Sequence, residues 1–264
     1  MKLPIEFGEP KSIKFLWMTQ CHLIGKIPES FNNLHSLVTL DLGINYLEDE
    51  IPSGLFLLKN LTFLQLYNNT LSGKIPISIE AQNLEQIDPS HNSLTGTIPQ
   101  GMASLQKLEV LNLFNNQFHG VLPPGIGLIP SLKTLKLWSN RFSGTLPLEL
   151  GLHSRLEDFE VLDNEFTGQL PENLCSSGTL LGVVASNNQL NGSIPESLGQ
   201  CSTLQAIELY NNSFSGEIPE GLSTLQNLSV LVIGNNYFSG EILERLWRLD
   251  HISVMRLGNN QFSG

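Results

Sequence analysis

The sequence predicts an α/β-type repeat solenoid, a right-handed superhelix of about eleven coils with a parallel β-sheet on its concave side. Two observations predict this fold. Ten of the 14 prolines recur every 24 residues, with one interval of 23. Glycine and asparagine keep the same interval at fixed offsets from the proline. This register extends along the whole chain, so chance does not explain it.

The unit 108–123 shows how each element follows from the residues. Leu111 and Leu113 are two positions apart, so they face the same side of a short strand, the side of the core. Asn116 follows where the chain turns, and stacked coils can join such amides to backbone groups in an asparagine ladder. Gly120 permits an unusual backbone angle. The proline stops a helix on the return path, so we expect loops and short 3-10 or α turns on the convex side.

Two residues depart from this pattern. Cys21 takes the place of the ladder asparagine in the first unit, where a small, weak donor can substitute. Pro89 replaces a core leucine in the fourth unit, which also contains the 23-residue interval. Because proline lacks an N–H group, we expect an irregular coil and a weak point in the sheet there. The run Asp88-Pro89-Ser90-His91 is interpreted as this irregular coil, not as a Ser/His/Asp catalytic site.

The repeat matches the leucine-rich repeat pattern L-x-x-L-x-L-x-x-N-x-L. Stretches such as LSGKIP, LTGTIP, FSGTLP and FSGEIP resemble the plant-specific form of this repeat, typical of receptor-like kinase ectodomains and receptor-like proteins. LPENLCSSGTL (170–180) and IPESLGQCSTLQAIELYNNSFSG (194–216) further resemble the HAESA-like peptide-receptor kinases. The resemblance implies a segment that binds a secreted peptide on its concave face and works with a co-receptor kinase. It also implies the extracellular face of the plasma membrane, as part of a membrane-anchored parent.

Composition excludes several function classes. The 25 acidic residues outnumber the 14 basic ones, and the net charge of −11 argues against nucleic-acid binding and against docking on anionic membranes by charge. No apolar stretch approaches the ~18 residues of a membrane span, and the kinase motifs HRD and DFG are absent.

We therefore expect residues 1–264 to form a single solenoid without complete caps, a transmembrane segment or a kinase domain. This would be a fragment of a longer ectodomain or a truncated gene product. We expect no metal or cofactor, since the six histidines are dispersed without metal-ligand spacing. We also expect no enzyme activity, because a flat concave sheet offers little of the burial that tunes the pKa of a catalytic carboxylate. The alternative function is a receptor-like or polygalacturonase-inhibitor-like defence protein without a kinase.

Strand alternation directs aromatic side chains outward on the concave face. Tyr67, Phe114 and Trp138 follow one column on the third, fifth and sixth coils. Exposed aromatic residues near charges are common anchors of peptide interfaces, although scattered surface aromatics are also common.

The seventh coil carries Asp158, Glu160 and Asp163, and Arg155 and Lys136 relieve their repulsion only partly. These carboxylates form a patch for a basic ligand segment, or they serve only the solubility of an acidic protein. The arginine pair that many receptors of the resembling subfamily use for a ligand carboxylate is incomplete, because Gly258 follows Arg256 where the second arginine would be. The predicted ligand-binding residues are Phe63, Tyr67, Phe114, Lys136, Trp138, Asp158, Glu160, Asp163, Glu208, Tyr210 and Arg256.

Two kinds of covalent modification are also expected. Cys175 and Cys201 lie on adjacent coils, where they form either a disulfide or two buried thiols. Five Asn-x-Ser/Thr sequons fall outside the core positions and fit a secreted parent. They are Asn60, Asn68, Asn191, Asn211 and Asn227.

Overall fold

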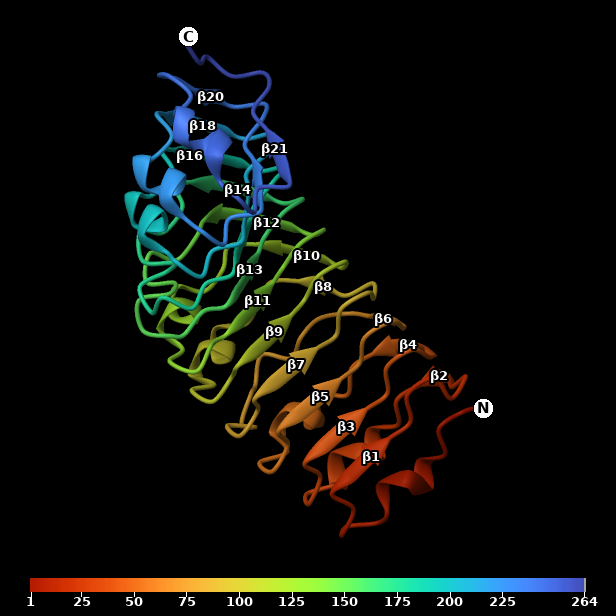
Figure 1. Cartoon of the computed structure of the whole chain (residues 1–264). Helices are drawn as coiled ribbons and strands as arrows, with labels where there is room; N and C mark the ends of the chain where they lie inside the picture. The colour runs from red at the N-terminus through yellow and green to blue at the C-terminus, as the bar shows by residue number, and fades with distance from the viewer. Residues whose placement is uncertain (264) are drawn as a thin grey trace.

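The computed structural model describes residues 1–263 and shows a curved solenoid whose two ends lie far apart (Figure 1). One sheet of eleven parallel strands runs along the whole molecule, and each strand pairs with the strand of the next coil. Its strands are β1 (Phe15–Trp17), β3 (Thr39–Asp41), β5 (Phe63–Gln65), β7 (Gln86–Asp88), β9 (Val110–Asn112), β11 (Thr134–Lys136), β13 (Asp158–Glu160), β15 (Gly182–Val184), β17 (Ala206–Glu208), β19 (Val230–Val232) and β21 (Val254–Arg256). The predicted solenoid and its parallel sheet are confirmed.

Each strand of this sheet is three residues long, and every strand except the end strands β1 and β21 buries its central side chain. The central residues of the end strands, Leu16 and Met255, are half-buried. In β11, for example, Leu135 is fully buried while Thr134 and Lys136 are half-buried on the opposite face. The central residues join one apolar column that extends from Leu3 to Leu249. The outward residues form the concave surface on which the ligand-binding residues were predicted.

Two shorter sheets lie along a second side of the solenoid, and sequence periodicity did not predict them. A three-stranded sheet contains β2 (Ile24–Lys26), β4 (Tyr46–Glu50) and β6 (Thr70–Ser72). A seven-stranded sheet contains β8 (Thr95–Gly96), β10 (Gln117–Gly120), β12 (Arg141–Thr145), β14 (Glu165–Gly168), β16 (Gln189–Gly192), β18 (Ser213–Gly216) and β20 (Tyr237–Phe238). The repeated glycine ends most of these strands at positive φ, as at Gly120 (79°).

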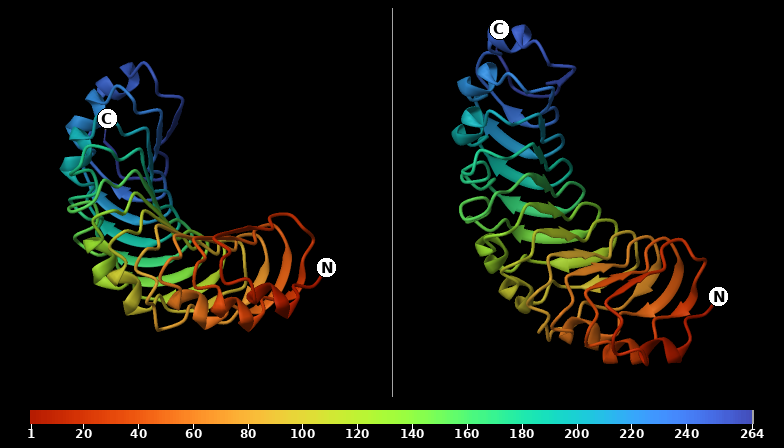
Figure 2. Two further views of the ribbon diagram at one scale, coloured as in Figure 1. Left: turned by 90° about the horizontal axis from the view of Figure 1, so that it is seen from below. Right: turned by 60° about the horizontal axis from the view of Figure 1, so that its bottom comes forward.

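The convex side carries 3-10 helices that follow the outer edge of the arc (Figure 2). They are η1 (Ile5–Gly8), η2 (Glu29–Asn33), η3 (Ser53–Leu57), η4 (Gln100–Ser104), η5 (Pro124–Leu128), η6 (Glu196–Gln200), η7 (Glu220–Thr224) and η8 (Glu244–Arg248). The repeated proline precedes seven of them as the N-cap residue, as Pro28 does for η2. The short 3-10 turns expected on the convex side are confirmed, and the proline directly precedes them because its fixed φ suits the residue before a helical turn.

The asparagine ladder is confirmed. Asn69 donates its amide to the carbonyls of Leu42, Leu66 and Tyr67 at 3.0–3.2 Å. Its Oδ1 accepts the backbone N–H of Leu47 from the preceding coil at 2.9 Å. Cys21 keeps only one comparable bond, from its Sγ to the carbonyl of Thr19 at 3.5 Å, and it is exposed. Each asparagine thus satisfies backbone groups of its own coil and of the coil before it.

The fourth coil is irregular, as predicted. Strand β7 begins ten residues after Pro76, whereas β5 begins eleven after Pro52, and no 3-10 helix forms in that shorter segment. Pro89 is buried and lacks an N–H group, and β7 pairs with β9 through two residues instead of three. The break between the two lateral sheets falls at the same coil. A bridge from Lys74 to Thr95 remains there, together with backbone hydrogen bonds from Ser93 to Leu71 and from Thr95 to Gly73.

Cys175 and Cys201 form a disulfide between adjacent coils, with their Cα atoms 5.9 Å apart. The bridge spans a part of the convex side, residues 171–178, that forms turns instead of a 3-10 helix. In the described part of the chain, no helix has the length and apolarity needed to cross a membrane.

Candidate ligand-binding face

Three aromatic rings meet on the concave face at the fourth to sixth coils. Phe114 and Trp138 follow β9 and β11, and their rings stack with centroids 4.4 Å apart and planes 11° apart. The ring of His91 lies edge-on to both, with centroid distances of 5.1 Å to Phe114 and 6.0 Å to Trp138. These three residues are called the aromatic cluster below. The cluster combines an apolar platform with a polar edge, an arrangement suited to peptide side chains.

Tyr67 belongs to the predicted aromatic column but not to this cluster. Its ring lies over Gly43 on the preceding coil, so closely that a Cβ atom at Gly43 would be 2.6 Å from the ring. Ser90 is the residue at this column position on the coil between Tyr67 and Phe114, and it is buried. Burial, followed by the charges of Asp41 and Asp88, raises the pKa of Tyr67 above 10.0. Tyr67 therefore presents a protonated hydroxyl group at neutral pH.

His91 was not predicted as a ligand-binding residue, although the sequence contains a signal for it. It occupies the position just before each ladder asparagine, where residues have φ near +50° and side chains border the concave face. His91 is hydrogen-bonded to Asn115 at the same position of the next coil. The recurrent pair of polar residues, such as Asn115-Asn116, indicates this second polar column.

One of the three carboxylates of the predicted acidic patch is neutralised within the chain, and the other two accept hydrogen bonds from neutral donors. Glu160 forms an ion pair with Lys136 at 2.9 Å, and both side chains are about a quarter exposed. Asp158 accepts a hydrogen bond from the Thr134 hydroxyl group at 3.4 Å. Asp163 accepts one from Asn187 at 2.7 Å. Lys136 thus relieves the repulsion more directly than expected, and Arg155 is exposed without an ion pair among residues 1–263.

Asp158 and Asp163 have no cationic partner among residues 1–263, and neither do Asp41 and Asp88 on other coils. Asp41 accepts the N–H of Gly43 at 2.9 Å. Asp88 accepts hydrogen bonds from the Ser90 hydroxyl group at 2.5 Å and from Asn112 at 3.0 Å. Since His91 is bonded to Asn115 instead, Asp88, Ser90 and His91 do not form a catalytic triad.

The other predicted residues are spread along the face. Phe63 is half-buried on β5, and Glu208 is half-buried on β17 without an ion pair in the described residues. The Tyr210 hydroxyl group accepts a hydrogen bond from Asn235 at 2.8 Å. Arg256 is exposed on β21. These residues do not converge on one small site, so they define a long surface.

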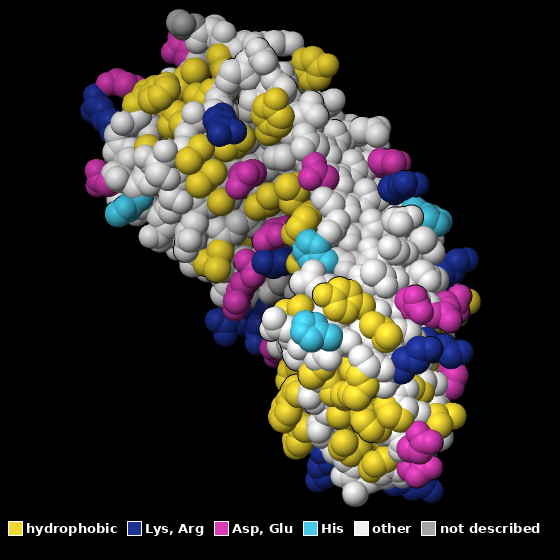
Figure 3. Space-filling model, turned by 90° about the vertical axis from the view of Figure 1, so that its right-hand side faces the viewer, with side chains coloured by type: hydrophobic (Ala, Val, Ile, Leu, Met, Phe, Trp, Pro, Cys, Tyr) yellow, Lys and Arg dark blue, Asp and Glu magenta, His cyan; other side chains and the backbone are white. Residues whose placement is uncertain are grey.

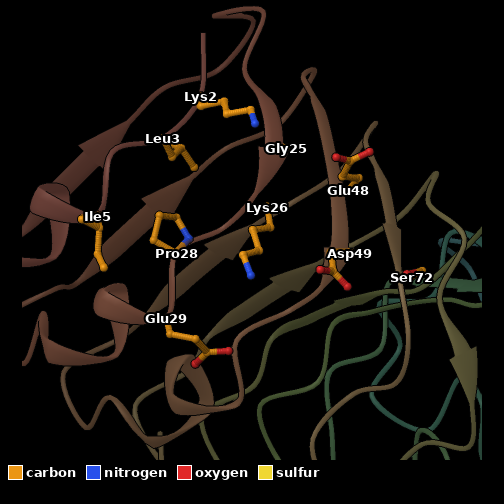
Figure 4. A pocket seen from close by; sticks show the side chains of 10 residues that line it. All are labelled: Lys2, Leu3, Ile5, Gly25, Lys26, Pro28, Glu29, Glu48, Asp49 and Ser72. Atoms are coloured by element: carbon orange, nitrogen blue, oxygen red, sulfur yellow. The ribbon is translucent and has the colours of Figure 1, made fainter.

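Two further features of the N-terminal coils were not predicted as sites. Phe15 and Trp17 are exposed on β1 and stack with centroids 5.5 Å apart. A hollow of about 950 Å³ lies away from the concave face, beneath the three-stranded sheet (Figure 4). Its charged side chains are Lys2, Lys26, Glu29, Glu48 and Asp49. Within residues 1–263, no group of three or more His, Cys, Asp or Glu side chains is placed to hold a metal ion.

Comparison with known proteins identifies the repeat. The Leucine Rich Repeat family model matches residues 12–34, 60–81, 107–128, 131–152 and 203–225. The structure of the Arabidopsis receptor kinase HAESA ectodomain in complex with an N-terminally extended IDA peptide hormone is 39% identical. The two structures superpose with a TM-score of 0.97, and the match covers 100% of the present chain and 44% of the HAESA chain. The chain is a leucine-rich repeat solenoid similar to the ectodomains of plant receptors.

Two further matches are a receptor kinase bound to a co-receptor and a receptor-like protein. HAESA in complex with IDA and the co-receptor SERK1 is 35% identical, with a TM-score of 0.87 over all of this chain and 52% of that one. Receptor-like protein 52 of Arabidopsis thaliana is 48% identical over 85 residues, which are 32% of this chain and 10% of the relative. The chain therefore spans about half of the solved ectodomains and about a tenth of this curated relative.

Proposed function

We propose that this leucine-rich repeat ectodomain binds an extracellular peptide on its concave face and so senses a signal at the plant cell surface. The observation that carries this proposal is the aromatic cluster, which lies next to the Lys136–Glu160 ion pair on a sheet face that no other helix or strand of residues 1–263 covers. The peptide-hormone complexes of similar ectodomains support the proposal.

The geometry favours an extended peptide that runs along the solenoid axis. Coils repeat at about 4.8 Å, so the six intervals from Tyr67 to Tyr210 span roughly 29 Å. An extended peptide advances about 3.3 Å per residue and covers this distance with roughly nine residues. Its apolar side chains would pack on the aromatic cluster. Asp41, Asp88 and Glu208 would attract basic groups, because these carboxylates have no cationic partner in the described chain.

The remaining parts of the function follow from the relatives and are proposals for the whole protein. The intact parent would carry a membrane anchor and an intracellular Ser/Thr kinase domain, and this ectodomain would lie outside the plasma membrane. A co-receptor kinase would join the peptide-bound receptor, as the HAESA complex with SERK1 suggests. The chain itself would then be a binding module of one solenoid and would catalyse no reaction.

A receptor-like or inhibitor-like protein without a kinase is the second candidate. The match to receptor-like protein 52 favours it. In that case the concave face would bind a defence target, such as a cell-wall enzyme. The gene sequence downstream of Gly264 distinguishes the two candidates, since a membrane span followed by a kinase would exclude the second.

The test is a peptide-library pull-down with the intact ectodomain and three variants. Trp138→Ala removes half of the aromatic stack, and Glu160→Lys reverses one charge of the ion pair. Trp247→Ala is the matched control, because this tryptophan is 61% exposed on the convex helix η8. We expect the first two variants to lose at least tenfold in affinity for the selected peptide and the control to retain it. Unchanged binding in both concave variants would refute the proposed face.

A further inference from the structure

A hollow of about 360 Å³ lies beside the Asn68 sequon. Ile44, Tyr46 and Asn68 are among the residues that line it. The ladder residues Asn45 and Asn69 line it as well, and both are buried. The hollow is within the size range of sites for small ligands.

This hollow combines an apolar residue at Ile44 with an aromatic residue at Tyr46, a pair found on no other coil among residues 1–263. Ile44 is 41% exposed and has a φ of 53°, which a β-branched side chain rarely adopts. Tyr46 is 60% exposed and stacks on His22 with centroids 6.2 Å apart. Figure 3 shows hydrophobic side chains gathered over the N-terminal coils on this side of the molecule. Asparagine occupies the position of Ile44 on six other coils, at Asn68, Asn115, Asn187, Asn211, Asn235 and Asn259. A strained, exposed isoleucine where asparagine would fit indicates a specific role.

The amide of Asn68 also differs from the others in this column. The side chains of the other five asparagines each bond to a side chain of the preceding coil. Among residues 1–263, the Asn68 side chain makes no such bond, because its neighbour on the preceding coil is Ile44, which cannot accept one. Asn68 is exposed, and the Thr70 of its sequon lies on β6. Its amide nitrogen is therefore free to carry a substituent.

We propose that Asn68 carries an N-linked glycan and that this hollow seats its first sugar, an N-acetylglucosamine. The Asn68 Nδ2 atom forms a bond to the anomeric carbon of a sugar carried on a lipid diphosphate. The bond from that carbon to the diphosphate oxygen breaks, the lipid diphosphate leaves with the electron pair, and Nδ2 loses one proton to solvent. The apolar face of the sugar ring packs on Tyr46 and Ile44, and its polar groups face His22. This proposal requires passage through a secretory pathway but does not depend on any peptide ligand.

The seated sugar would stabilise the coils that it contacts, since it covers apolar surface otherwise open to water. The test uses the full chain, secreted from a eukaryotic host, with the other four sequons closed by Asn→Gln substitutions. Glycopeptide mass spectrometry measures occupancy at Asn68. One sample is trimmed enzymatically to the single N-acetylglucosamine, and another has the whole glycan removed. We expect the trimmed and untrimmed proteins to have the same melting temperature. The melting temperature of the deglycosylated protein should be about 2–4 °C lower.

Two variants make the test specific. Tyr46→Ser removes the aromatic wall, and because Tyr46 is exposed the fold does not require it; we expect the melting difference to disappear. The matched control removes the sequon at Asn68 by Asn68→Gln and creates a new sequon at Asn187 by Gln189→Thr. Asn187 has the same backbone conformation (φ 55°) and is preceded in its column by Asp163, not by an apolar residue. Glycan removal there should leave the melting temperature unchanged.

A proton NMR spectrum gives a local readout. The acetyl methyl signal of the Asn68-linked sugar should be shifted upfield by the Tyr46 ring, and Tyr46→Ser should abolish that shift. An unoccupied Asn68, an equal thermal effect at Asn187, or a sugar signal unaffected by Tyr46→Ser would each overturn the proposal.

Discussion

Substitution of a ladder asparagine tests what holds the coils together. In Asn69→Ala, three backbone carbonyls and the Leu47 N–H group lose their partner, at a residue that is only 9% exposed. The amide has two hydrogens, so the loss corresponds to about three hydrogen bonds. At roughly 0.5–1.5 kcal/mol each, we expect the free energy of unfolding to fall by about 2–4 kcal/mol.

Urea unfolding followed by circular dichroism measures this loss, with Asn227→Ala as the control. Asn227 also donates one bond to a backbone carbonyl, that of Ser202 at 2.8 Å, but it is exposed and water can replace it. We expect the control to lose less than about 0.5 kcal/mol. Equal losses in the two variants would show that the ladder adds nothing beyond an ordinary surface hydrogen bond.

Three other predictions concern individual features of the fold. Because Pro89 lacks an N–H group, amides of β7 and β9 should exchange hydrogen faster than those of β13, and equal protection would contradict this weak point. Replacing Cys175 with alanine opens the disulfide to Cys201 and should cost about 3 kcal/mol in urea unfolding, unless non-reducing mass spectrometry finds no bridge. Asp41→Asn should lower the pKa of Tyr67 toward 10.0, with burial still keeping it raised, as measured by phenolate absorbance against Tyr67→Phe; no change would exclude Asp41 as a cause. Because the folded pKa is raised, the stabilisation from protonated Tyr67 is complete below pH 10 and is lost as the pH rises above it.

The sequence predicts the main sheet and the ladder because both depend on one residue per unit. Leu135 is buried at the centre of its strand and Asn69 joins two coils, and the same residue types recur at these two positions in successive units. The lateral sheets escaped prediction because their strands are two to five residues long and only partly periodic in sequence. The short convex turns were predictable from the proline, because a fixed φ excludes a helix at that residue without excluding a short helical turn directly after it.

The candidate site was only partly predictable because strand alternation gives the face of a side chain but not its direction within that face. Tyr67 and Trp138 occupy equivalent positions, yet Tyr67 lies over Gly43 while Trp138 stacks on Phe114. The difference depends on the residue at the same position of the adjacent coil, a glycine in one case and an aromatic in the other. The ion pair of Glu160 likewise depends on which long side chain lies one coil away.

The division of the lateral sheet has a mechanical consequence. The concave sheet is continuous from β1 to β21, whereas the sheet beside it is divided between β6 and β8. Backbone hydrogen bonds still join Ser93 to Leu71 and Thr95 to Gly73 across this division, but β7 pairs with β9 through only two residues. We therefore expect the solenoid to resist bending least at this coil. The fourth coil is therefore the natural joint of this molecule, with three coils before it and seven after it. A ligand that contacts both Tyr67 and the aromatic cluster would span this joint and hold the two segments at one angle.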